Sequence, residues 1–165
     1  MVTGLVLVDL SAAYDTVNHR CLLNKILELT KDTHLTELIE SMLENRLFFV
    51  ELGGKKSRWI RLKNGLPQGS VLAPLLFNIY TDDQPRSDDT PRFIYADDLG
   101  IAAQAADFTV VEERLSRALD ELTPYYEANH LRANPSKTQV CAFHLRNRES
   151  KRQLKVNWSG SPLEH

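Results

Sequence analysis

Two apolar segments of this chain end in, or enclose, carboxylates. The run "LVLVDL" (5–10) reads as a buried strand that closes on Asp9, and "FIYADDLGIAA" (93–103) carries Asp97 and Asp98 at its centre. The other paired aspartates, at 82–83 and 88–89, stand among polar and turn-forming residues, where a solvated loop explains them. Asp97 and Asp98, flanked on both sides by strand-like residues, therefore require a chemical explanation.

Carboxylates brought together in a fold repel one another, by about 4 kcal/mol for a pair about 4 Å apart at an effective dielectric constant near 20. A divalent cation relieves this repulsion, and oxygen-only ligands favour Mg²⁺ or Mn²⁺ over zinc. Bridging carboxylates hold two such ions about 3.5 to 4 Å apart, the separation used for in-line phosphoryl transfer. If Asp9, Asp97 and Asp98 converge, the sequence predicts a two-metal site.

The elements that would position these acids alternate between the two periodicities of regular structure. Helices are expected at about 19–29, over the stripe from Leu35 to Leu43, from a Ser70 cap to about Asp83, and from a capping box of Thr109 and Glu112 to a bend or end at Pro124. Strands are expected at 5–10, around a hairpin at Gly53 and Gly54, on both sides of the Asp97–Asp98 tip, and at 138–145 and 154–157.

Setting aside residues 19–63 as a helical and hairpin insertion, the order is strand, helix, strand hairpin, helix, strand. This order predicts an α+β fold of the ferredoxin-like, split βαβ type: an antiparallel sheet with helices on one face and the other face open. Alternation along the strand places Tyr95 and Asp97 on the same, open face. The first strand and the hairpin are expected to be central neighbours, which would bring Asp9 to the hairpin tip.

Composition is that of one globular domain: 165 residues, 42% hydrophobic and 25% charged, with a net charge of −2. No apolar run is long enough to cross a bilayer and no secretory signal opens the chain, so we expect no membrane partner. Two cysteines without a disulfide framework favour a reducing, intracellular location. We predict a single domain over 1–162 and a cloning scar over 163–165 ("LEH").

Basic residues form two local groups despite the slightly acidic total. The first group lies within nine residues, at Lys55, Lys56, Arg58, Arg61 and Lys63, and the second at Arg146, Arg148, Lys151, Arg152 and Lys155. Clustered cations provide affinity for phosphate, whereas a solvated surface explains them equally well on charge alone.

Four motifs in order resemble the palm of a reverse transcriptase of the non-LTR (LINE-like, jockey-type) retrotransposons. "LVLVDLSAAYD" is similar to the first palm motif of that family, "GLPQGSVLAPLLFNIY" to the second, "FIYADD" to the third and "NPSKTQV" to the fourth. The resemblance covers nearly the whole chain. It implies an RNA-directed DNA polymerase with RNA template, DNA primer and dNTP as partners, and a parent protein of the cytoplasm and nucleus.

The resemblance also implies roles for individual residues. Asp9, Asp97 and Asp98 match the catalytic carboxylates that hold two Mg²⁺ (or Mn²⁺) ions, with Asp9 and Asp97 as direct ligands and the Leu10 carbonyl as an additional one. Lys137 matches a lysine that acts as a general acid toward pyrophosphate. The remaining matches concern the substrates. The residues that match the dNTP site are Ala13, Tyr14 and Gln68, and the Tyr14 ring is the gate that excludes a 2′-hydroxyl. The residues that match template and primer contacts are Pro67, Gln68, Gly69 and Tyr95. Asp15 is typical of the group without an evident chemical role.

The sequence departs from the family by what it does not contain. The basic finger residues that precede the first palm strand and the thumb that follows the palm are absent, so we expect little or no polymerisation by these 165 residues alone. Two further hypotheses stay open: a non-catalytic RNA-binding module, whose fold is also split βαβ, and an inactive retroelement remnant. A phosphoacceptor receiver domain is excluded, because its acidic pair precedes the other site residues and its sheet is parallel.

Overall fold

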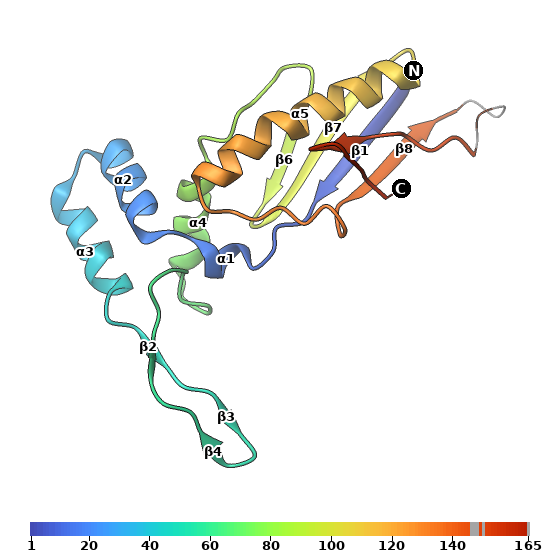
Figure 1. The fold of residues 1–165 in the computed structure, drawn as a ribbon. Helices are drawn as coiled ribbons and strands as arrows, with labels where there is room; N and C mark the ends of the chain where they lie inside the picture. Colours follow the sequence, from blue (N-terminus) through green and yellow to red (C-terminus); the bar gives the residue numbers. More distant parts are fainter. Residues whose placement is uncertain (146–148, 150, 165) are drawn as a thin grey trace. The chain divides into compact units, whose positions relative to one another are not determined.

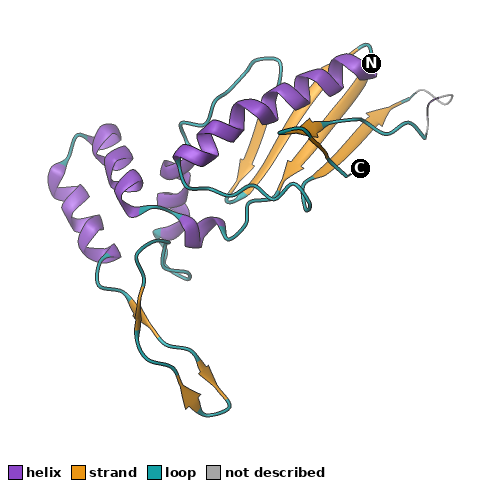
Figure 2. Cartoon of the chain, viewed as in Figure 1, coloured by secondary structure: helices purple, strands orange, loops and turns teal. Residues whose placement is uncertain are grey.

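The computed structural model describes residues 1–145, 149 and 151–164. Within the segment predicted as one domain, the chain packs into two compact units. The sheet unit contains residues 1–13 and 83–165, and the helical unit contains residues 14–82. Figure 2 shows helices and strands in these units.

The sheet unit is built on four antiparallel strands in the order β6-β7-β1-β8. Their bounds are β1 Val2–Val8, β6 Arg92–Tyr95, β7 Asp98–Ala105 and β8 Gln139–His144. Helix α5 (Phe108–Ala128) lies across one face (Figure 1). A two-stranded ribbon of β9 (Asn157–Trp158) and β10 (Ser161–Pro162) completes the unit.

Alternation along the central strands separates a buried face from an open one. Val6 and Val8 of β1 and Leu99 and Ile101 of β7 are at most 3% exposed and pair across the two strands. The matching apolar stripe of α5 is fully buried and consists of Val111, Leu115, Leu119 and Leu122. At Gly4 a Cβ atom would lie 2.5 Å from Val111 Cγ1 and 2.7 Å from Leu115 Cδ1, so only glycine lets α5 approach β1 this closely.

The helical unit begins with the short α1 (Ala13–Thr16), whose first residue belongs to the sheet unit, and continues with α2 (His19–Thr30) and α3 (Thr33–Leu43). Asn18 and Asp32 cap these two helices by accepting hydrogen bonds from the N–H groups of Cys21 and Leu35. Helix α2 packs on both α3 and α4 (Ala73–Thr81). The hairpin contains β2 (Leu47–Phe48), β3 (Glu51–Leu52), β4 (Lys55–Lys56) and β5 (Ile60–Arg61).

Three expected helix boundaries were wrong. Helix α4 starts at Ala73 rather than directly after Ser70, because Pro74 has no N–H to donate to the Ser70 carbonyl four residues back. Helix α5 starts at Phe108, and the side chain of Glu112 accepts a hydrogen bond from Lys155 N–H instead of closing a capping box with Thr109. Of the two outcomes expected at Pro124, a bend or an end, the end is wrong: Pro124 lies inside α5, which continues to Ala128 because residues beyond the proline, such as Tyr126, are buried.

The C-terminal segment takes part in the sheet unit. Leu163 is 8% exposed, and the Glu164 carbonyl accepts a hydrogen bond from Val140 N–H at 3.1 Å. The strand expected at 154–157 is observed at Asn157–Trp158. Of the second basic group, Arg146 and Arg148 lie outside the described residues, whereas Arg152 contacts Glu112 and Glu149. In the described part of the chain, no helix is both long and apolar enough to cross a membrane.

Two buried polar groups of the sheet unit, the Tyr126 hydroxyl and the Arg92 guanidinium, have no hydrogen-bond partner among the described residues. Burial raises the pKa of Tyr126 above its ordinary value of 10.0, and the nearby charge of Arg92 opposes this shift. Burial also lowers the pKa of Arg92. The folded state holds the Tyr126 proton more tightly than the unfolded state does. The stability that this difference contributes is therefore fully present below about pH 10 and is lost as the pH rises further.

We therefore expect Tyr126→Phe to raise the free energy of unfolding by about 1 kcal/mol at neutral pH, since it removes an unsatisfied hydroxyl. The variant should also lose less stability than the wild type between neutral pH and about pH 11. Urea denaturation followed by far-UV circular dichroism measures both effects. Tyr125→Phe is the matched control, because its hydroxyl donates to Asp83 at 2.6 Å and its loss should destabilise. Equal alkaline losses in wild type and Tyr126→Phe would contradict this assignment.

Candidate active site

The acidic doublet lies where β6 turns into β7. Tyr95 and Asp98 form the last pair of the hairpin, so Ala96 and Asp97 make a two-residue turn. Ala96 has φ 53°, in the left-handed region that costs a residue with a Cβ atom about 1 to 2 kcal/mol. Both aspartates are exposed. A strained, tight turn therefore presents the doublet to solvent at the end of the sheet.

The strand register brings Asp9 to this turn. The last pair between β1 and β7 is Val8 with Leu99, and Asp9 follows Val8 while Asp98 precedes Leu99. Asp9 and Asp98 are therefore neighbours across the two central strands, one step beyond the paired residues. The same register places Asp98, rather than Asp97, opposite Tyr95. Asp97 lies in the turn, where strand alternation does not apply, so its expected position on the same face as Tyr95 stays a prediction.

The backbone of Asp9 is held on both sides by the loop that carries Lys137. Asp9 N–H donates to Thr138 Oγ1 at 3.3 Å, and Asn134 N–H donates to the Asp9 carbonyl at 2.9 Å. Thr138 Oγ1 in turn donates to the Asn134 carbonyl at 2.9 Å. Lys137, exposed, belongs to the loop bonded directly to Asp9, and the neighbouring Leu10 pairs with Ala133. These hydrogen bonds therefore join the first and the fourth predicted motifs, although Asp9 and Asn134 are 125 positions apart in the sequence.

The donor chemistry of this region is that of hard oxygen ligands. Asp9, Asp97 and Asp98 offer only carboxylate oxygens, and the adjacent Leu10 adds a backbone carbonyl. Across the described residues, no three His, Cys, Asp or Glu side chains form a group that could hold a metal ion. Strand register makes Asp9 and Asp98 neighbours, with Asp97 in the adjoining turn, and the convergence of all three carboxylates on a metal ion stays a prediction.

A second group of predicted residues is assembled inside the helical unit. The rings of Tyr14 and Phe77 stack with centroids 4.6 Å apart and planes inclined by 13°. Tyr14 lines a pocket together with Gln68 and Gly69, whose other walls are Ser70, Ala73 and Pro74. Tyr14 and Gln68, two of the three residues expected to contact a dNTP, therefore line one cavity. Pro67 is half-buried in the same loop, and Ala13 is buried at the end of the sheet unit.

Asp15 has a structural role that the sequence did not reveal. Its Oδ1 accepts a hydrogen bond from Gln68 Nε2 at 3.0 Å, which fixes the orientation of the Gln68 side chain beside Tyr14. The two residues are 53 positions apart, so no local pattern could indicate the contact. Asp15 thereby positions a residue that the family resemblance assigns to the nucleotide.

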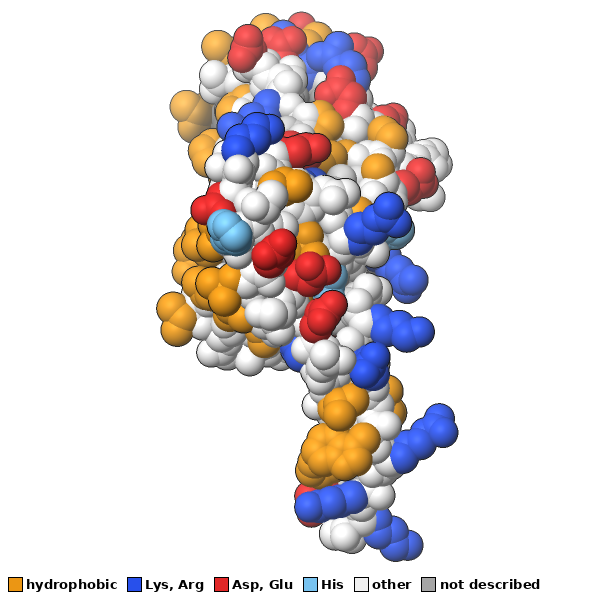
Figure 3. All heavy atoms as spheres, turned by 90° about the vertical axis from the view of Figure 1, so that its left-hand side faces the viewer, with side chains coloured by type: hydrophobic (Ala, Val, Ile, Leu, Met, Phe, Trp, Pro, Cys, Tyr) orange, Lys and Arg blue, Asp and Glu red, His pale blue; other side chains and the backbone are white. Residues whose placement is uncertain are grey.

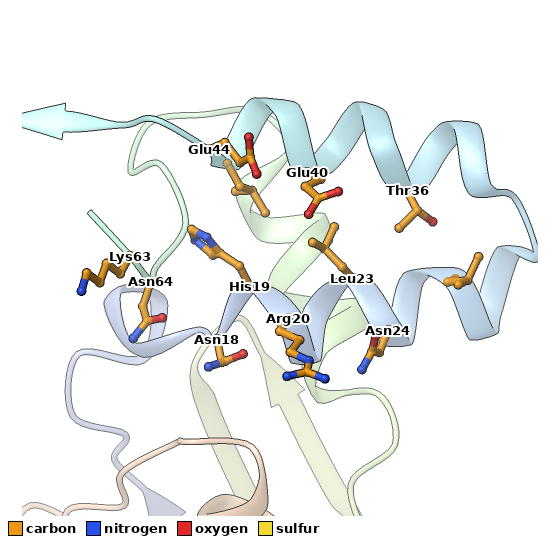
Figure 4. A pocket seen from close by; sticks show the side chains of 12 residues that line it. Asn18, His19, Arg20, Leu23, Asn24, Thr36, Glu40, Glu44, Lys63 and Asn64 are labelled. Atoms are coloured by element: carbon orange, nitrogen blue, oxygen red, sulfur yellow. The ribbon is translucent and has the colours of Figure 1, made fainter. Parts of the chain in front are cut away.

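The loop that carries Gln68 is anchored at Gly65. Gly65 N–H donates to the Val17 carbonyl and Leu66 N–H to the Tyr14 carbonyl, at 2.8 and 2.9 Å. The Gly65 carbonyl lies 2.8 Å from both His19 Nε2 and Arg46 Nη1. His19 also lines a pocket between α2 and α3, whose walls include Leu23, Glu40, Glu44, Lys63 and Asn64 (Figure 4). None of the residues predicted for chemistry lies in that pocket.

An apolar groove borders the acids on the open face of the sheet. Its walls include Leu5, Leu7, Phe93, Tyr95 and Asp98. Tyr95 is 83% exposed and therefore free to contact a substrate. The end of the sheet unit combines exposed carboxylates with an accessible aromatic and aliphatic surface.

Residues 1–163 match the family model described as reverse transcriptase (RNA-dependent DNA polymerase). The chain belongs to this family. The RNA-directed DNA polymerase from mobile element jockey of Drosophila melanogaster is 30% identical over 143 residues, 82% of this chain and 16% of that protein. A Pol polyprotein from the type-1 retrotransposable element R2 of Popillia japonica is 28% identical over 145 residues, 81% of this chain and 23% of that protein.

Solved structures of telomerase have the same reverse transcriptase fold. Apo telomerase from Candida Tropicalis, truncated from the C-terminal domain, superposes with a TM-score of 0.65 at 15% identity, covering 96% of this chain and 33% of that one. Telomerase from Candida albicans, in a complex with a fragment of telomeric RNA, gives a TM-score of 0.66 at 12% identity over 97% of this chain. The predicted family and the α+β class with antiparallel sheets are confirmed. The chain spans less than a quarter of the length of the retrotransposon polymerases named above.

Two glycines of the reverse transcriptase loop provide a matched test of its anchoring. Gly65 and Gly69 have φ 85° and 84°, but a Cβ atom on Gly65 would lie 2.8 Å from the Asp15 carbonyl oxygen, whereas one on Gly69 would meet nothing within 4 Å. Gly69→Ala should cost about 1 kcal/mol through backbone strain alone. Gly65→Ala should cost about 2 to 4 kcal/mol, because the steric clash adds to the strain. Urea denaturation compares the two, and equal losses would contradict the close contact between the loop and Asp15.

Proposed function

We propose that this chain is the catalytic palm portion of an RNA-directed DNA polymerase of a non-LTR retrotransposon. In this proposal it transfers nucleotides from dNTP to the 3′-hydroxyl of a DNA primer on an RNA template. The observation that carries the proposal is the register that makes Asp9 and Asp98 neighbours across β1 and β7, with Asp97 in the adjoining turn. The strands lie in the sheet in the order β6-β7-β1-β8, and along the chain the β6–β7 hairpin and helix α5 come between β1 and β8. This arrangement supports a split βαβ palm.

The acids at the end of the sheet would hold two Mg²⁺ or Mn²⁺ ions. Asp9 and Asp97 are the proposed direct ligands, with Asp98 beside them and the Leu10 carbonyl as an additional oxygen donor. When bound, such ions activate the primer hydroxyl and neutralise charge on the triphosphate. The chain contributes rigidity: because both backbone groups of Asp9 are hydrogen-bonded, its carboxylate extends from a fixed point.

Proton transfer to the leaving group is assigned to Lys137. As the primer 3′-oxygen bonds to the α-phosphorus, the bond from that phosphorus to the bridging oxygen breaks and pyrophosphate leaves. The Lys137 Nζ donates a proton to this leaving group, which lowers the cost of its developing charge. The hydrogen bonds between the Lys137 loop and Asp9 support this role, since they tie the acid and the lysine to one end of β1.

Selection of the nucleotide is assigned to the pocket of Tyr14 and Gln68. The Tyr14 ring, supported by stacking on Phe77, would lie under the sugar and exclude a 2′-hydroxyl, and the small Ala13 would leave room for the deoxyribose. Gln68, oriented by Asp15, would contact the incoming nucleotide. Pro67 and Gly69, with Tyr95 of the sheet unit, would contact template and primer.

Polymerisation would require further parts of a longer protein. The finger residues that grip the triphosphate and the thumb that holds the duplex would come from outside these 165 residues, in a parent that acts in the cytoplasm and nucleus. The 165 residues alone would then extend a primer weakly or not at all.

Metal binding is testable without polymerisation. In the ¹⁵N-labelled chain, Mn²⁺ should broaden the amide signals around Asp9, Asp97 and Asp98 before all others. Asp9→Asn and Asp97→Asn should weaken this binding at least about tenfold, because each removes a charged ligand. Asp98→Asn compares the two members of the doublet, and Asp88→Asn, on a polar loop, is the control that should change nothing. Broadening centred on residues 82–89 would refute the assignment of the site.

Catalysis is tested by primer extension on an RNA template, using a polypeptide that continues the reading frame through fingers and thumb. Asp9→Asn should lower the rate at least about a hundredfold. Tyr14→Val should raise the use of rNTP relative to dNTP about tenfold or more, since the steric conflict with the 2′-hydroxyl is removed. Metal binding without any synthesis by the longer polypeptide would identify an inactive remnant. Rapid synthesis by the 165 residues alone would show that fingers and thumb are dispensable.

A further inference from the structure

A hairpin arm, residues 47–61, extends away from helices α2 and α3 in the helical unit (Figure 1). Its tip is a two-residue turn of Gly53 and Gly54, whose φ values of 57° and 74° suit the tight turn that matches the twist of a hairpin. The arm exposes many large side chains to solvent. None of its residues belongs to the proposed catalytic or nucleotide-binding groups.

A bulge in the middle of the arm positions an aromatic pair. Between the pairs Phe48 with Ile60 and Glu51 with Lys56, residues 49–50 face residues 57–59, so one strand carries an extra residue. The Ser57 hydroxyl stabilises this bulge by accepting from Val50 N–H and donating to the Arg58 carbonyl, both at 2.9 Å. The bulge is therefore a defined, hydrogen-bonded feature.

The aromatic pair at the bulge consists of Phe49 and Trp59. Their ring centroids are 4.7 Å apart with planes inclined by 80°, and Trp59 is 63% exposed. Leu52, Val50 and Leu47 add apolar surface, at 82%, 56% and 54% exposure. Because Trp59 is packed on Phe49 and yet 63% exposed, it offers ring surface on which another flat ring can stack.

Cations surround this platform. Lys55, Lys56, Arg58 and Arg61 lie on the arm and Lys63 follows it, while Glu51 is the only acid between residues 47 and 63. Lys56 lies 3.6 Å from Glu51 and also 5.0 Å from the Phe49 ring centroid. Figure 3 shows Lys and Arg side chains projecting from the arm around a group of hydrophobic side chains. This surface is complementary to a flexible polyanion that carries flat apolar groups.

We propose that the arm binds single-stranded nucleic acid, with a base stacked on Trp59 and phosphates contacted by Lys55, Arg58 and Arg61. Single-stranded binding sites combine these two features, since stacking needs unpaired bases and the cations follow the backbone. A duplex hides its base faces and therefore uses only the cations. The proposal goes beyond the polymerase reaction, because it requires neither metal nor dNTP.

The two tryptophans of the chain allow a direct test, because Trp59 is exposed and Trp158 is 3% exposed. Titration with a twelve-nucleotide oligouridine should quench tryptophan fluorescence through stacking on Trp59. Trp59→Phe should abolish the quenching yet retain binding of the fluorescein-labelled oligonucleotide, measured by anisotropy. Trp59→Ala should weaken that binding about 5-fold to 150-fold, corresponding to one stacked base. Unchanged fluorescence, or Trp59→Ala with wild-type affinity, would overturn the proposal.

The phosphate contacts are tested by the salt dependence of the same binding. Replacing Lys55, Arg58 and Arg61 together by alanine should reduce the slope of log affinity against log salt by about 2, at about 0.7 for each contact. Lys151→Ala with Lys155→Ala, in the other basic group, is the control and should leave the slope unchanged. Far-UV circular dichroism confirms that each variant is folded.

Two controls separate this proposal from the polymerase proposal. Trp59→Ala should leave the Mn²⁺ broadening around Asp9, Asp97 and Asp98 unchanged even though it weakens oligonucleotide binding. An RNA duplex of equal length should compete poorly, and equally strong competition would overturn the role of stacking.

Discussion

The pairing of β1 with β7 in one register determines how the rest of the sheet unit is arranged. Side chains alternate between faces, so a shift of one residue would move Val6 and Val8 from beneath α5 to the open face. The same shift would separate Asp9 from Asp98. Burial of the valines against α5 is thus the physical reason that two acids, almost ninety positions apart in the sequence, lie at the same end of the sheet. The apolar core and the charged end are specified together.

The two groups of predicted residues depend on different forces. In the sheet unit, strand register and the hydrogen bonds of residues 134–138 fix the acids. In the helical unit, ring stacking on Phe77 and the anchored Gly65 loop fix Tyr14 and Gln68. Each group is held by contacts within its own unit. Mutations that weaken one should therefore leave the local geometry of the other intact.

Much of this organisation was predictable from sequence, because it follows from periodicity and from motifs. The helix at 33–43, the Gly53–Gly54 hairpin and the strands around the acidic doublet are local patterns, and the structure has them. The errors arose where tertiary contacts decide. Glu112 bonds to Lys155 rather than capping its helix, and Pro124 is retained inside a helix by burial. The Asp15–Gln68 contact joins distant segments and has no local signature.

The pairing of β1 with distant strands also affects how the polypeptide folds during synthesis. Strand β1 is the first element of the chain, but its partners β7 and β8 are synthesised about 100 and 140 residues later. Until then the apolar segment Val2–Val8 has neither neighbour, and long-range pairing of this kind forms slowly. Until β7 and β8 are made, the nascent polypeptide therefore carries an unpaired, aggregation-prone strand that only segments far along the sequence can cover.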